Sequence, residues 1–121
     1  MRDILHGVIL VKSLKSDFEL EKNFKMVGHI GDSIKIVRVN TNDLKNKINL
    51  LKEAMVDNHY YIHFYDNNDK LIVVFKEKTF YLIKSKETWK NMLEYAKSLG
   101  ISEEQMNIET LYFKDENIDI D

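Results

Sequence analysis

The chain has no cysteine and no proline, and only four of its 121 residues are glycine. Without cysteine there can be no disulfide framework, no thiolate nucleophile and no zinc site built on sulfur, which fits a reducing compartment. No apolar run approaches the ~20 residues of a membrane-spanning helix, and the N-terminal residues do not resemble a signal peptide. These absences predict a cytoplasmic protein with no membrane partner.

The length and composition predict one α+β domain. A chain of 121 residues can bury a core without disulfides or metals, and 44 % hydrophobic with 31 % charged residues is ordinary for a globular protein. We place the domain at residues 1–113 and expect the acidic tail, residues 114–121, to be frayed. Residues 101–121 hold seven acids against one lysine, whereas residues 70–97 hold seven lysines against three glutamates. This asymmetry indicates either two solvated segments or a tail that folds onto the basic region of the same or a second subunit.

Hydrophobic periodicity predicts the order of the elements. We expect two amphipathic helices, at residues 42–56 and 85–99, while residues 14–31 are irregular or contain one short strand. The expected strands are at residues 4–11, 34–39, 59–65, 70–76, 79–84 and 106–113. This order matches a ferredoxin-like (split β-α-β) core with extra N-terminal strands, in which both helices cover one face of an antiparallel or mixed sheet.

The turn between the third and fourth expected strands sets the predicted register. A two-residue Asn67-Asn68 turn would place Tyr65 opposite Lys70, and it assigns every other residue of the meander to one of two faces. The first face is almost wholly apolar and is expected to pack under the helices. It contains Tyr60, Ile62, Phe64, Leu71, Val73, Phe75, Phe80 and Leu82.

The second predicted face mixes aromatic, aliphatic and imidazole side chains. Such a surface needs a cover, and the candidates are the N-terminal strands, a second subunit or a ligand. The binding or interface candidates on it are His59, Tyr61, His63, Tyr65, Ile72, Val74, Tyr81 and Ile83.

Motifs that would carry catalysis or bind a metal are absent. His59 and His63 are four residues apart on a strand, which separates them by about 13 Å, too far to share one ion. The sequence from Asp66 to Asp69 lacks the glycine and the distal glutamate of a calcium loop. Gly28 and Gly31 lead into a strand rather than opening a helix as a phosphate loop does. We therefore predict no metal, no cofactor and no catalytic residue.

The sequence suggests three functions, which we give in order of preference. The first is a non-catalytic binding or regulatory module that forms a homodimer through the second face. The alternative is a small-molecule-binding protein or enzyme with a pocket around His63 and its neighbouring tyrosines. Single-stranded RNA binding comes third, because the tyrosines with Lys70 and Lys76 resemble a stacking platform, but the chain is acidic and lacks the glycine-aromatic pattern of an RNA-recognition motif.

Overall fold

The computed structural model describes residues 4–106, 108, 113, 116 and 119–120. The described α-helices and strands are β1 (Ile4–Leu10), α1 (Leu20–Asn23), β2 (Lys25–Ile30), β3 (Ile34–Asn40), α2 (Leu44–Ala54), β4 (Tyr61–Tyr65), β5 (Lys70–Phe75), β6 (Thr79–Ile83), α3 (Lys90–Ser98) and β7 (Asp119–Ile120). Within this part of the chain, no helix is long and apolar enough to cross a membrane.

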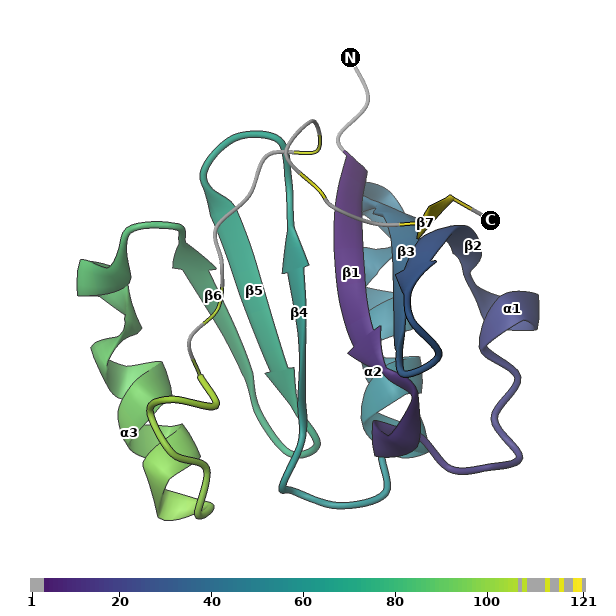
Figure 1. The fold of residues 1–121 in the computed structure, drawn as a ribbon. Coiled ribbons are helices and arrows are strands. Elements are labelled where there is room, and N and C mark those ends of the chain that lie inside the picture. The colour runs from purple at the N-terminus through teal and green to yellow at the C-terminus, as the bar shows by residue number, and fades with distance from the viewer. Residues whose placement is uncertain (1–3, 107, 109–112, 114–115, 117–118, 121) are drawn as a thin grey trace.

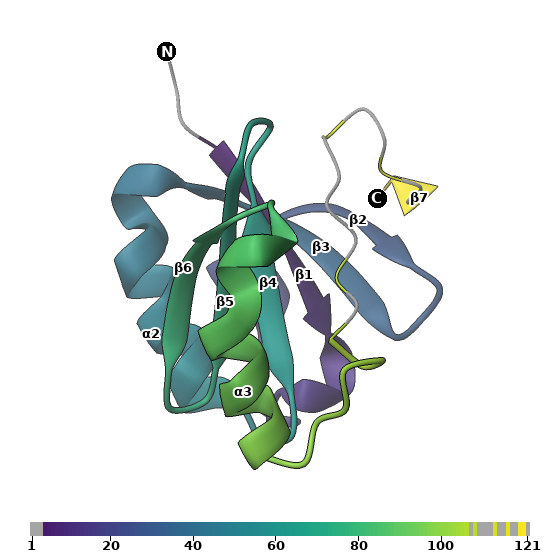
Figure 2. The same cartoon turned by 90° about the vertical axis from the view of Figure 1, so that its left-hand side faces the viewer.

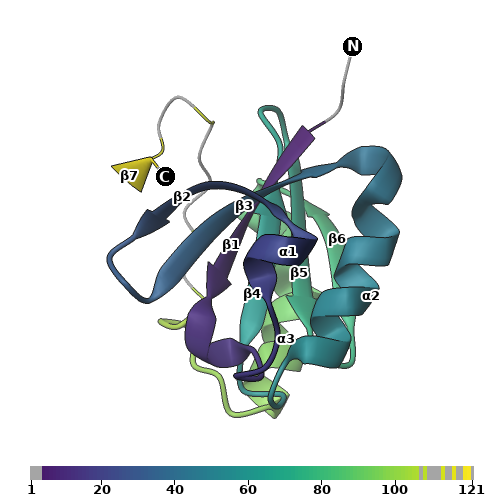
Figure 3. The ribbon, with the colours of Figure 1, turned by 90° about the vertical axis from the view of Figure 1, so that its right-hand side faces the viewer.

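The strands form one antiparallel sheet in the order β6-β5-β4-β1-β3-β2-β7, with β1 at its centre (Figure 1). The α+β class is therefore confirmed, and five of the six expected strands are present with ends shifted by at most two residues. Most of the sixth, at residues 106–113, lies outside the described residues. Residues 14–31, which we expected to be irregular or to contain one short strand, contain the strand β2 and also the helix α1. Figure 3 shows α1 on the same side of the sheet as α2, where Leu20 packs against the core.

Gly7 lies in the middle of β1, between its two neighbouring strands. It pairs with Val37 of β3 and with Phe64 of β4. A Cβ atom at this position would lie 2.4 Å from Cε1 of the Phe64 ring. Only glycine therefore lets this ring lie across β1, in the core where Phe64 is fully buried.

The β4–β5 hairpin does not have the predicted register. A carboxylate oxygen of Asp66 accepts the backbone N–H groups of Asn68 and Lys70, both at 2.9 Å. This side-chain turn holds three residues in the loop instead of two, so Tyr65 pairs with Leu71 rather than with Lys70. Because side chains alternate along a strand, the one-residue shift moves every residue of β5 to the other face relative to β4. The two predicted faces were therefore wrong.

The β5–β6 hairpin is shifted as well, by two residues. Its turn is at Lys76 and Glu77, and the N–H of Phe75 donates to the carbonyl oxygen of Lys78 at 2.8 Å. Val73 therefore pairs with Phe80. An even shift leaves each residue of β6 on the predicted side of β5.

The two long helices lie on opposite faces of the sheet, so the prediction of both helices on one face was wrong (Figures 1 and 2). The shifted register makes both faces of β4 and β5 apolar, and each face needs its own cover. The core under α2 includes Leu44, Ile48, Leu51, Ile62, Phe64, Ile72 and Val74. The core under α3 includes Tyr65, Leu71, Val73, Phe75, Trp89, Met92 and Ala96.

We expect Gly7→Ala to lower the free energy of unfolding by about 1–3 kcal/mol, because the added methyl group overlaps the Phe64 ring. In a strand position with room for a methyl group, the same change would be stabilising. Urea denaturation of the two proteins measures the difference. In a Phe64→Leu background, where the ring atoms are gone, the alanine should cost less. An equal cost in both backgrounds would contradict the account of Gly7.

Candidate functional site

The eight residues predicted to share one face are divided between two faces. Tyr61, His63 and Tyr65 of β4 point to the α3 side of the sheet, where Tyr61 and Tyr65 belong to the α3 core. His59 precedes β4, and its exposed ring lies 3.3 Å from a carboxylate oxygen of Asp57. The other four residues point to the α2 side.

Of the four residues on the α2 side, two are buried and two are exposed. Ile72 and Val74 lie under α2 and are at most 1 % exposed. Tyr81 and Ile83, on the neighbouring strand β6, are 65 % and 47 % exposed because α2 does not extend over them. Only these two remain as surface candidates on that side.

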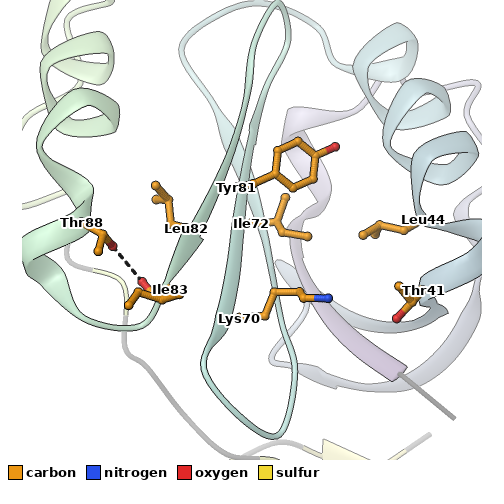
Figure 4. A pocket seen from close by; sticks show the side chains of 8 residues that line it. All are labelled: Thr41, Leu44, Lys70, Ile72, Tyr81, Leu82, Ile83 and Thr88. Carbon is orange, nitrogen blue, oxygen red and sulfur yellow. Dashed lines mark hydrogen bonds between the residues drawn. The ribbon is translucent and has the colours of Figure 1, made fainter.

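A groove follows β6 between the two helical layers. Its volume is about 550 Å³. Figure 4 shows the β5–β6 hairpin with α3 on one side and α2 on the other, and with Ile72 and Tyr81 pointing toward α2. The groove is lined by Thr41, Leu44, Lys70, Ile72, Tyr81, Leu82, Ile83 and Thr88. Lys70 is the only charged side chain in this set.

The backbone of β6 has an outward-facing edge, since β6 is the last strand of the sheet on this side. The N–H of Lys84 donates to Asp69 O at 2.7 Å, so position 84 bonds to the β5 side. Because bonded and non-bonded pairs alternate in an antiparallel ladder, Phe80 and Leu82 also bond to β5. The N–H and C=O groups of the odd-numbered positions 79, 81 and 83 therefore point away from the sheet.

One end of this edge is closed and the rest is open. The carbonyl oxygen of Ile83 accepts the indole N–H of Trp89 at 2.8 Å and the hydroxyl of Thr88 at 3.2 Å. Among the described residues, nothing pairs with the outward backbone groups of Thr79 and Tyr81. The Thr79 hydroxyl is also buried without a partner in this part of the chain. The open edge can therefore accept another strand.

A polar cluster on the α3 side joins β1 and β4 to two residues near the C-terminal end of the sequence. Nδ1 of His6 lies 2.8 Å from a carboxylate oxygen of Glu116, and the Tyr65 hydroxyl donates to the same oxygen. The Phe113 ring stacks on His6 with centroids 3.8 Å apart. Burial, helped by the hydrogen bond and the charge of Glu116, raises the pKa of Tyr65, so its phenol stays protonated. The cluster binds part of the acidic tail to the sheet, while the expected domain boundary at residues 113/114 stays a prediction.

His63 lies between two tyrosines, and its side chain is half-buried. Its ring centroid is 6.2 Å from that of Tyr61 and 6.1 Å from that of Tyr65. Burial lowers the pKa of His63 to about 4, so the ring is neutral at pH 7. Among the described residues, no group of three or more histidine, aspartate or glutamate side chains is placed to hold a metal ion.

Sequence reasoning missed His6 and Glu116, because 110 positions separate them and no spacing pattern connects such residues. The open edge could have been found, since Lys78 and Lys84 flank β6 and lysine is typical of exposed edge strands. Comparison of the chain with protein-family models, curated proteins and solved structures found no match. The ferredoxin-like arrangement is therefore not confirmed, and its placement of both helices on one face is not what the structure shows.

Tyr65→Phe removes only the hydroxyl that bonds to Glu116, and we expect it to lower the free energy of unfolding by about 1–3 kcal/mol. Tyr81→Phe is the matched control, because the Tyr81 side chain is exposed. It should change the stability by less than about 0.5 kcal/mol. Urea denaturation at pH 7 measures both, and equal effects of the two substitutions would contradict the role of Glu116.

Proposed function

We propose that the protein is a non-catalytic binding module that takes up an extended segment of a partner protein along β6. The observation that carries the proposal is the open backbone edge at Thr79 and Tyr81, between two layers of helix. Addition of a strand to such an edge is a common mode of peptide recognition, in which backbone hydrogen bonds provide affinity.

The groove supports the same proposal. An added strand would place alternate side chains on the two sides of the sheet. On the α2 side they would lie near Tyr81 and Ile83, and on the α3 side near Leu82. These contacts favour a segment with apolar residues in alternation.

Charge determines which partner fits this edge best. Lys78 and Lys84 flank β6, and Nζ of Lys84 already donates to the carbonyl oxygen of Asp66 at 2.8 Å. Residues 70–97 carry a sum of +4 from seven lysines and three glutamates. Lys70 is the one charged residue among the described residues that line the groove. We infer that the partner segment has acidic residues at its ends.

A second copy of this chain fits the edge less well. Symmetric pairing of two β6 strands centred on Tyr81 would place Lys78 of each copy opposite Lys84 of the other. Like charges directly opposite each other destabilise a strand pair. Homodimerisation through the face predicted from the sequence would also require Ile72, Val74 and Tyr65, which are buried within the chain. Self-association is therefore the competing outcome.

Tyr81→Pro tests the proposal, because proline removes an N–H that points outward and leaves the β5 ladder intact. The probe is a short synthetic peptide of alternating valine and threonine with aspartates at both ends. We expect the unmodified protein to bind it and the Tyr81→Pro protein to lose at least about tenfold in affinity, since one backbone hydrogen bond and its neighbours are lost. Fluorescence anisotropy measures the affinity.

Two controls accompany this experiment. Tyr81→Ala keeps the backbone N–H and should bind more tightly than Tyr81→Pro, and the same peptide with lysines at both ends should bind more weakly than the aspartate form. Sedimentation of the protein without peptide gives its oligomeric state. Equal binding by the Tyr81→Pro protein, or a stable dimer that excludes the peptide, would overturn the proposal.

A further inference from the structure

A second cavity, of about 420 Å³, lies on the α3 side of the sheet, away from the β6 groove. Its floor is aliphatic and comes from Val8 and Leu10 of β1 and Ile34 of β3. One wall is formed by Tyr61 and His63 of β4. The volume falls within the range of small-molecule sites, ~300–1,000 Å³.

The segment after α3 forms the opposite wall. Gly100 has a φ of +86°, which reverses the chain after the helix and brings Ile101 back to the sheet. Ser102 and Gln105 then hold a reciprocal capping box, in which N–H of Ser102 donates to Oε1 of Gln105 at 2.9 Å and N–H of Gln105 donates to the Ser102 hydroxyl at 3.2 Å. The Tyr61 hydroxyl donates to the carbonyl oxygen of Gln105 at 2.7 Å. These bonds fix the wall in place without a ligand.

The lining of the cavity has one sign of charge. Among the described residues, no carboxylate lines it, whereas Lys12 and His59 do. His59 already faces Asp57, but Lys12 makes no ion pair with any described residue. The ring of His63 likewise has no hydrogen bond to the described part of the chain.

We propose that this cavity binds a small aromatic carboxylic acid, with its ring between the aliphatic floor and the His63–Tyr61 wall and its carboxylate next to Lys12. The flat ring matches the two aromatic side chains, and the anion matches Lys12, the one lysine or arginine among the described lining residues. A cationic ligand would find no carboxylate among the described residues of the lining. This site does not depend on the β6 edge, since the cavity and the groove share no lining residue.

The probes are 2-naphthoate and 2-naphthalenemethanol, which share a ring system and differ in the anionic group. We expect 2-naphthoate to shift the Cε1–H resonance of His63 saturably in NMR titrations at pH 7, with no shift at His29, which does not line the cavity. The neutral alcohol should bind about fivefold more weakly, as expected for one exposed ion pair.

Two variants assign the effect. Lys12→Met should weaken the binding of 2-naphthoate by about fivefold and leave the affinity for 2-naphthalenemethanol unchanged, because only the carboxylate contacts the ammonium group. The Tyr81→Pro protein should bind 2-naphthoate as the unmodified protein does. A failure of the naphthoate experiment and a failure of the peptide experiment can therefore be told apart. The absence of a saturable shift at His63, or equal affinity for both probes, would overturn the proposal.

Discussion

The carboxylate of Asp66 is the group on which the arrangement of this protein depends. By accepting the N–H groups of Asn68 and Lys70, it holds a three-residue loop between β4 and β5. That loop sets the register of the hairpin, and the register decides which side chains of β5 share a face with those of β4. Ile72 and Val74 consequently join Ile62 and Phe64 under α2. Leu71, Val73 and Phe75 join Tyr65 under α3.

Because both faces of β4 and β5 are apolar, α2 covers one face and α3 covers the other. This arrangement also shapes the edge of the sheet at β6. α2 covers β5 but leaves Tyr81 and Ile83 of β6 exposed, while α3 covers the other side. The backbone edge of β6 thus lies between two layers of side chains, in a groove (Figure 4). Lysines at both ends of β6 are typical of edge strands that must not pair with copies of themselves. In the proposed complex, Lys78 and Lys70 would favour an acidic partner segment, since Lys84 already bonds to Asp66.

The sequence was sufficient for most elements and insufficient for their register. Helical stripes such as Leu44, Ile48 and Leu51 predicted α2 correctly, because a 3.6-residue period survives without tertiary information. The predicted faces of β4 and β5 were wrong because the register was off by one residue. Asn67-Asn68 fits a two-residue turn by its own propensity, and the competing side-chain hydrogen bonds of Asp66 cannot be read from composition. Of the candidate site, Tyr81 and Ile83 were identified but were assigned to the same face as Tyr61 and His63. The contact of His6 with Glu116 has no local signal at all.

Amide hydrogen exchange along β6 in the free protein tests the central claim most directly. The claim is that the backbone N–H of Tyr81 points outward from an open edge of the sheet. We expect slow exchange at Phe80 and Leu82, whose N–H groups bond to β5, and fast exchange at Thr79 and Tyr81. Slow exchange at Tyr81 with fast exchange at Phe80 would show that the register is wrong. Slow exchange at all four positions would show that the edge is already covered, and either result would contradict the account.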